Sequence, residues 1–116
     1  MIHRVRTRAE FDLIGRRGHR VRDDLLWCTH LHDPSILPPR VAFAIGRAHG
    51  PAVVRNRLRR RLRAAFRELA AAGLVPAGTY LVGIERSMTE HLLRTSGSDL
   101  IDRVALLIDR ASTGRT

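Results

Sequence analysis

Arginine is concentrated in one short stretch of the chain, where six of the nine residues from 55 to 63 are arginine. This stretch reads RNRLRRRLR and contains no acidic residue. Arginine is permanently charged, and its planar guanidinium group donates paired hydrogen bonds to phosphate oxygens and stacks on nucleobases. These residue types at this density predict a site for a phosphate-rich polyanion.

The arginines lie within a predicted long helix that begins at Pro51 and ends before Gly73. Proline suits the first helical position because its missing N–H needs no partner there, and glycine commonly follows a last turn. At about 100° per residue, one side of this helix is apolar and the opposite side is basic. The apolar side holds Val54, Leu58, Leu62, Ala65 and Leu69, and the basic side holds Asn56, Arg59, Arg60, Arg63 and Arg67, with Arg55, Arg57 and Arg61 on the flanks.

The alternative interpretation of this charge is an ordinary solvated helix face. Such faces usually mix lysine and glutamate, whereas this chain has no lysine and the stretch has no acid before Glu68. Like charges three and four residues apart repel one another, so the helix is destabilised until an anion binds. We therefore favour nucleic-acid binding.

Three other residues of chemical interest, Cys28, His30 and His32, share one face of a predicted strand. They would spread over roughly 13 Å, too far to share one metal ion, so a core thiol with exposed imidazoles is favoured. The acidic residues are scattered, and there is neither a phosphate-binding Gly-x-x-x-x-Gly-Lys motif nor a Gly-x-Ser-x-Gly motif. The sequence predicts a binding protein with no catalytic residue and no metal site of its own.

The elements that must position the arginines form an α+β pattern. A capping box at Thr7 and Glu10 begins a helix that reaches residue 17. Strands are predicted over 24–32, 40–45 and 79–84, and helices over 89–94 and 99–111. The second strand, the arginine helix and the third strand form a crossover with parallel strands. We predict one α+β domain over 1–111 with a mixed sheet of about four strands, and a flexible tail over 112–116.

The whole-chain charge agrees with this interpretation. The net charge is +10, all 21 cationic residues are arginine, and only 11 residues are acidic. A field of this sign attracts nucleic acid or anionic membranes. Membrane binding is disfavoured because the chain has neither an apolar run of about 18 residues nor a signal-peptide pattern. The single cysteine excludes an intrachain disulfide, which indicates an intracellular, cytoplasmic protein.

At the motif level, the chain resembles a known family. Val41-x-Phe43-x-Ile45, then Arg47, Gly50, Ala52-Val53-Val54 and the RNRLRR-x-LR run resemble the RNR signature of the protein subunit of bacterial ribonuclease P. The resemblance extends from the helix with Phe11 through the strand at 79–84. The order of elements is similar to that family's α/β sandwich, so the resemblance implies this ribosomal-protein-like fold. It implies a ribonucleoprotein in which a catalytic RNA removes the 5′ leader of precursor tRNA by hydrolysis.

The resemblance also implies the partners and the contact residues. The partners would be the catalytic RNA and precursor tRNA, with Mg²⁺ at sites formed mainly by RNA and a monomeric protein. The RNA-binding residues implied by position are Arg47, Arg55, Asn56, Arg57, Arg60 and Arg63, to which the helix face adds Arg59 and Arg67. A groove for the single-stranded leader is expected to use Phe11, Cys28, His30 and Arg86. The chain departs from the family at Gly15, Ala48 and Glu85, where an aromatic and two basic residues are common.

Three other functions fit the charge. A ribosomal protein or general RNA chaperone would share the charge and a similar fold. A DNA-binding helix would need a helix-turn-helix partner just before residue 51, which the sequence lacks. A free-standing nuclease would need clustered acids beside the arginines.

Overall fold

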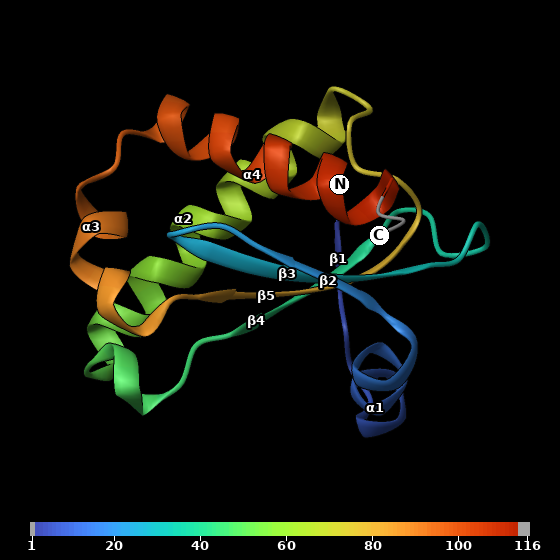
Figure 1. Cartoon of the computed structure of the whole chain (residues 1–116), viewed down its shortest axis with the longest axis horizontal. Coiled ribbons are helices and arrows are strands. Elements are labelled where there is room, and N and C mark those ends of the chain that lie inside the picture. Colours follow the sequence, from blue (N-terminus) through green and yellow to red (C-terminus); the bar gives the residue numbers. More distant parts are fainter. Residues whose placement is uncertain (1, 114–116) are drawn as a thin grey trace.

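The computed structural model describes residues 2–113, which fold into a five-stranded mixed sheet with helices on both faces (Figure 1). From edge to edge the strands run β1, β4, β5, β3 and β2. Their bounds are β1 (His3–Arg4), β2 (His19–Arg22), β3 (Leu26–His32), β4 (Arg40–Ala44) and β5 (Gly78–Ile84). The helices are α1 (Arg8–Arg17), α2 (Ala52–Ala71), α3 (Thr89–Arg94) and α4 (Gly97–Thr113), and the 3-10 turns η1 (Arg47–His49) and η2 (Arg86–Met88) precede α2 and α3. The predicted α+β class is confirmed.

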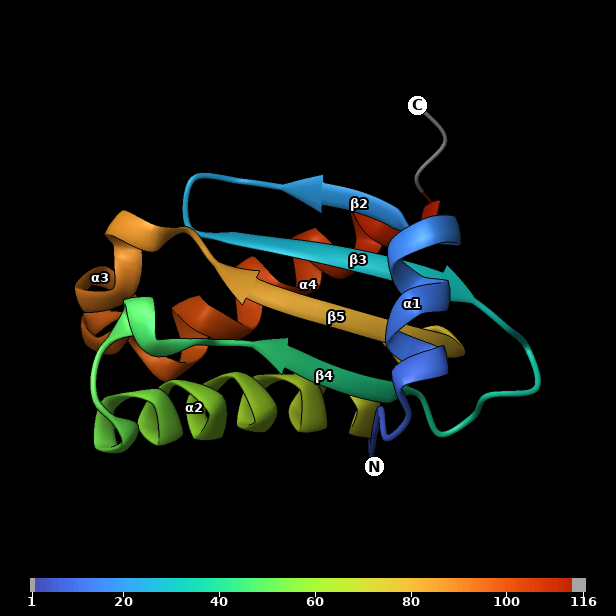
Figure 2. The ribbon, with the colours of Figure 1, turned by 90° about the horizontal axis from the view of Figure 1, so that it is seen from below.

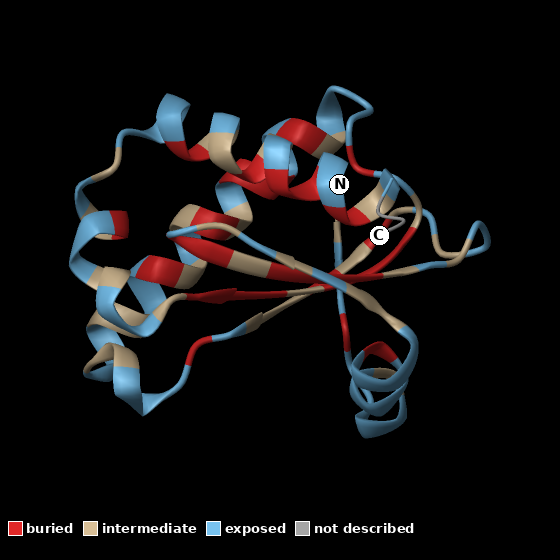
Figure 3. Cartoon of the chain, viewed as in Figure 1, coloured by how far each residue is buried: buried red, intermediate tan, exposed pale blue. Residues whose placement is uncertain are grey.

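The sheet separates α1 from α2 and α4 (Figures 1 and 2). Apolar side chains of α2 and α4 pack on one face, where Leu58, Leu62, Val104 and Ile108 are at most 1% exposed. Buried residues gather between the sheet and these two helices, whereas α1 buries only Ile14 (Figure 3). The sheet therefore has one closed face and one face that α1 covers only in part (Figure 2).

The crossover expected around the arginine helix is confirmed, because β4 and β5 are parallel neighbours and α2 connects them. Pro51 is the N-cap of α2, so the helix begins at Ala52, one residue later than expected. Gly73 follows the helix with a φ of +74°, in the left-handed region that glycine adopts at little cost. The capping box of α1 is also present, since Glu10 N donates to Thr7 Oγ1 and Glu10 Oε1 accepts from Thr7 N.

Two strands of the sheet were not predicted. β1 is only two residues long and pairs in parallel with the start of β4. β2 pairs antiparallel with β3, from His19 opposite His30 to Arg22 opposite Trp27. Its sequence, HRVR, contains one apolar residue and so gives no alternating signal. Pairing to a neighbouring strand, rather than burial of its own side chains, makes this segment a strand.

The last helix is longer than expected. α4 begins at Gly97 instead of residue 99, and it continues to Thr113, two residues into the segment predicted to be a tail. The rest of that tail, 114–116, lies outside the described residues. Within 2–113, no helix is both long and apolar enough to cross a membrane.

Candidate nucleic-acid interface

The apolar side of α2 anchors this helix to the sheet. Leu58, Leu62 and Phe66 are at most 1% exposed. The Phe66 ring meets Phe43 and Tyr80 edge-on, at centroid distances of 6.1 and 6.0 Å. Burying a large apolar side chain contributes about 1.5–3 kcal/mol, so these contacts hold the helix firmly. The basic side is thus presented on a fixed support.

One flanking arginine of α2 has a structural role. Arg61 donates hydrogen bonds to the carbonyl oxygens of Leu92 and Thr95 at the end of α3. The last carbonyls of a helix have no partner within the helix, and a guanidinium group satisfies two of them at once. Arg61 therefore fastens α3 to α2.

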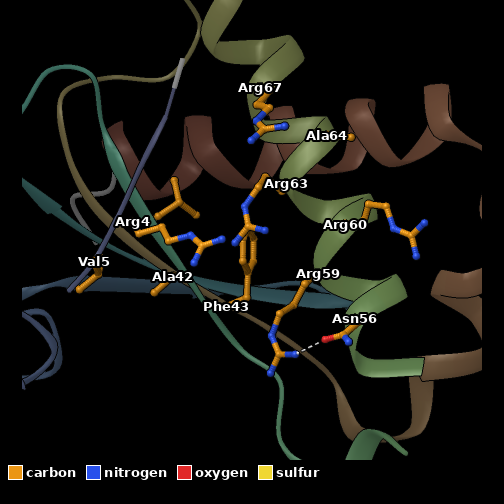
Figure 4. Close-up of a pocket in the computed structure, with 11 residues that line it drawn as sticks. Arg4, Val5, Ala42, Phe43, Asn56, Arg59, Arg60, Arg63, Ala64 and Arg67 are labelled. Carbon is orange, nitrogen blue, oxygen red and sulfur yellow. Dashed lines mark hydrogen bonds between the residues drawn. The ribbon is translucent and has the colours of Figure 1, made fainter. Parts of the chain in front are cut away.

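The basic side of α2 borders an open groove of about 570 Å³, which lies between the helix and the sheet edge formed by β4 and β1 (Figure 4). Its lining residues are Arg4, Val5, Val41, Ala42, Phe43, Asn56, Arg59, Arg60, Arg63, Ala64 and Arg67. Five predicted RNA-binding residues thus line one cavity. Arg4 joins them from β1, a strand that sequence reasoning missed, although the basic alternation of residues 4, 6 and 8 was a signal for it.

Two guanidinium groups of this groove are held in place by neighbouring groups. Arg59 donates to the Asn56 side-chain oxygen at 3.2 Å and to the Ile45 carbonyl at 2.9 Å. The Arg63 guanidinium lies 5.3 Å from the centre of the Phe43 ring, within cation–π range. Arg60 and Arg67 are exposed. The groove therefore combines two oriented donors with two free ones.

The groove charge is uncompensated by acids. The ion pairs within 2–113 use Arg22, Arg40, Arg94 and Arg103, so no arginine of α2 has a carboxylate partner there. Burial lowers the pKa of Arg63, and the nearby charges of Arg4, Arg67 and Arg59 lower it further. Arginine nevertheless stays protonated at neutral pH. A row of unpaired guanidinium groups is the electrostatic footprint of a polyanion site.

Three predicted RNA-binding residues lie outside this groove lining. Arg47 is exposed at the start of η1, and Arg57 is exposed on the outer side of α2. Arg55 is partly buried, and its Nε is buried without a hydrogen-bond partner among the described residues. A role for these three in RNA binding stays a prediction.

The expected leader groove needs a correction at two residues. Cys28 and His30 are 0% and 4% exposed, because they point to the sheet face that α2 and α4 cover. His30 stacks on Tyr80 at a centroid distance of 4.3 Å, and its Nε2 donates to the Ala77 carbonyl at 3.1 Å. The prediction that these two residues line an open groove is wrong. Alternation along the strand was correctly predicted, but it does not say which face the helices cover.

The partly open face belongs to the other set of alternating residues. Trp27 and Thr29 of β3 point to it, and the end of α1 approaches this face, since a Cβ at Gly18 would lie 2.5 Å from the Thr29 methyl group. Trp27 is partly exposed, Phe11 of α1 is 39% exposed, and Arg86 is exposed in η2. Sequence reasoning missed Trp27, whose large aromatic ring opposite the buried set was the available signal.

Comparison with known proteins decides the family. The sequence profile of the family described as ribonuclease P matches residues 2–105. The chain belongs to the ribonuclease P protein family. It is 36% identical to the ribonuclease P protein component of Symbiobacterium thermophilum over 109 residues, which covers 90% of this chain and 93% of that protein. It is 40% identical to the component from Thermobifida fusca over 87 residues, which covers 69% of this chain and 58% of that protein.

Solved ribonuclease P proteins share the fold. The protein from Thermotoga maritima superposes with a TM-score of 0.80 at 24% identity, covering 93% of this chain and 96% of that one. The protein from Staphylococcus aureus gives a TM-score of 0.75 at 19% identity, covering 94% and 96%. At these identities the likeness concerns the fold alone.

As a ribonuclease P protein, the chain is a subunit of a tRNA-processing endoribonuclease, a role that requires no catalytic residue of its own. Family membership thereby favours a ribonuclease P subunit over a ribosomal protein or a DNA-binding protein. Among residues 2–113, no group of three histidine, cysteine or acidic side chains is placed to hold a metal ion.

The position of Cys28 makes a simple prediction. Burial raises the pKa of this thiol to about 12, so the reactive thiolate is scarce and inaccessible in the folded protein. We expect an aromatic disulfide reagent to leave native protein unmodified and to modify one thiol per chain in denaturant. Rapid modification under native conditions would contradict the burial of β3 against the helices.

Proposed function

We propose that this ribonuclease P protein docks on the catalytic RNA of the enzyme through the groove beside α2, while the RNA performs the hydrolysis. The observation that carries the proposal is the row of groove arginines with no acidic partner within 2–113. Each arginine that contacts a phosphate releases condensed counterions, so binding is favourable and steeply salt-dependent. Arg47, Arg55 and Arg57 extend the same contact from the start of α2.

The partly open sheet face beside α1 is the proposed surface for the single-stranded 5′ leader of precursor tRNA. It offers Phe11 and Trp27 as aromatic surfaces, and Arg86 is an exposed cation in η2, after β5. Proteins bind single strands with this combination of stacking surfaces and backbone-directed charge, without reading much sequence. By holding the leader and the catalytic RNA together, the protein presents the scissile bond to the RNA in a fixed position.

Magnesium belongs to the RNA in this proposal. Mg²⁺ prefers oxygen ligands, and RNA phosphates supply them close to the scissile bond. When bound there, the ion activates water for hydrolysis. The protein residues hold the RNA and the leader and do not coordinate the ion. We further propose that one monomeric domain, over 1–111, acts in the bacterial cytoplasm.

Reconstitution tests this function. The protein is mixed with a bacterial ribonuclease P RNA and a labelled precursor tRNA, at a magnesium concentration where the RNA alone cleaves slowly. We expect the protein to restore cleavage at the mature 5′ end and to have no activity without the RNA. A basic RNA-binding protein of another family is the control for general chaperone effects. Equal stimulation by that control, or cleavage by the protein alone, would contradict the proposal.

A further inference from the structure

Trp27 lies flat against the neighbouring strand because residue 83 has no side chain. Trp27 and Gly83 are directly opposite each other in the β3–β5 pair. A Cβ at Gly83 would lie 2.2 Å from Cε2 of the indole ring, far inside the contact limit. Only glycine at this position allows the ring to rest on the backbone of β5. The indole therefore forms a flat layer on the face of the sheet that α1 leaves partly open.

Arg20 forms a second layer on the outer side of this indole. Its guanidinium carbon lies 4.2 Å from the ring centre, and its Nε donates to the Thr29 hydroxyl at 3.0 Å. β2 is paired with β3 so that Arg20 is opposite Thr29. Arg20 is exposed, and its position is set by these two contacts. The remaining guanidinium nitrogens have no hydrogen-bond partner within 2–113, so they can donate to a ligand.

The acid that pairs with β2 does not pair with Arg20. Glu85 follows β5 and lies 3.6 Å from Nε of Arg22, two residues further along β2. Within 2–113, Arg20 has no carboxylate within ion-pair distance. The site is therefore a cationic, planar and solvent-facing layer with an aromatic ring beneath it.

We propose that the Arg20–Trp27 pair is a platform that stacks one unpaired nucleobase of single-stranded RNA, with the guanidinium also donating to the adjoining phosphate. This inference rests on the proposed function, because it requires the leader to cross this sheet face. Proteins that recognise single-stranded RNA stack bases on aromatic rings and on arginine planes. The pair would fix one leader nucleotide at a defined position, whatever its base, while α2 binds the catalytic RNA.

The composition of the chain provides a direct probe, because Trp27 is the only tryptophan. The full chain is titrated with a dye-labelled single-stranded RNA oligonucleotide, and binding is followed by dye anisotropy and by tryptophan fluorescence. We expect the fluorescence to be quenched in step with binding. An abasic oligonucleotide with the same number of phosphates should bind roughly 5- to 150-fold more weakly, which is the loss expected for one stacked base. It should also quench the tryptophan fluorescence little.

The variant Arg20→Ala distinguishes base stacking at the platform from general electrostatic attraction of RNA to the protein. This variant should weaken oligonucleotide binding roughly 5- to 150-fold, while keeping the fold because Arg20 is exposed. Arg94→Ala on α3 is the matched control, since it removes one exposed arginine paired only with Glu90. An equal loss in the two variants, or tight binding of RNA without quenching, would overturn the platform and leave the leader-binding proposal standing. Failure of every oligonucleotide to bind would overturn both.

The holoenzyme supplies a second test. Precursor tRNAs with single abasic leader nucleotides are bound to enzyme reconstituted with wild-type or Arg20→Ala protein. We expect one leader position at which base removal weakens binding to the wild type but has little further effect in the variant, since coupled contacts do not add. Additive losses at every position would refute a stacked base at Arg20. Assembly with the catalytic RNA is measured separately, and it should be unchanged by Arg20→Ala.

Discussion

Replacing Arg60 and Arg67 together with alanine is expected to weaken binding of the protein to ribonuclease P RNA by roughly a hundredfold or more at moderate salt. The reason is that each hydrogen bond to a charged group contributes about 1.5–3 kcal/mol. Both side chains line the α2 groove and are exposed, so their removal creates no cavity. A plot of the logarithm of the binding constant against the logarithm of the salt concentration should also be less steep for the variant. If the RNA there is double-stranded, the slope should change by about 0.9 for each phosphate that the variant no longer neutralises. Filter binding over a salt series measures both quantities.

The control for this double variant is a second double variant with the same net charge. Arg94→Ala with Arg103→Ala also removes two arginines, but these belong to α3 and α4 and are paired with Glu90 and Asp24. We expect this control to change RNA affinity only slightly, and circular dichroism should show both proteins folded. If the two double variants lose the same affinity, the α2 groove is not the docking site and only total charge matters.

Gly78→Ala is expected to destabilise the protein by roughly 2–6 kcal/mol, adding about 1–3 kcal/mol of backbone strain to about 1–3 kcal/mol of overpacking. Gly78 has a φ of +125°, where a side chain is strained. A Cβ there would lie 2.3 Å from the Leu31 carbonyl oxygen and 2.9 Å from Nε2 of His30. The β3–β5 pair would have to separate to make room. Because such domains are stable by only about 5–15 kcal/mol, urea unfolding should show a large shift of the midpoint.

A second glycine supplies the comparison. Gly15 lies inside α1, and a Cβ there would meet nothing within 4 Å. Gly15→Ala should therefore stabilise the protein by about 0.5–1 kcal/mol through helix propensity. A Gly78→Ala protein that unfolds at the same urea concentration as the wild type would show that the tight approach of β5 to β3 is not required.

Several parts of this protein follow from local sequence. The capping box begins α1 as predicted, and Pro51 and Gly73 bracket α2. The periodicity of α2 separates an apolar side from a basic side, and the structure buries the first and exposes much of the second. Helices are stabilised by contacts between residues three and four apart, so their signals lie within one short stretch of chain. The RNR signature adds the family, which periodicity alone does not.

The arrangement of the strands required the tertiary structure. β2 has a single apolar residue and becomes a strand only through pairing with β3, and β1 does so through two residues beside β4. The basic groove likewise depends on Arg4, which β1 brings next to α2 from the start of the sequence. The contacts of β1 and of Arg4 join residues far apart in the chain, and no short window of sequence contains both partners.

The residue types of α2, their spacing and the RNR motif were sufficient to predict a basic helix for RNA and a ribonuclease P protein. The exposed face of β3 was not predictable in this way, because an alternating strand looks the same whichever face the helices cover. Packing of α2 and α4 buried Cys28 and His30 and left Trp27 on the partly open side. It also placed Arg61 against the end of α3, where its guanidinium group donates to backbone carbonyls, while the neighbouring Arg60 is exposed to solvent. The sequence determined which side chains carry the charge, and the packing of distant elements decided which of them face the solvent.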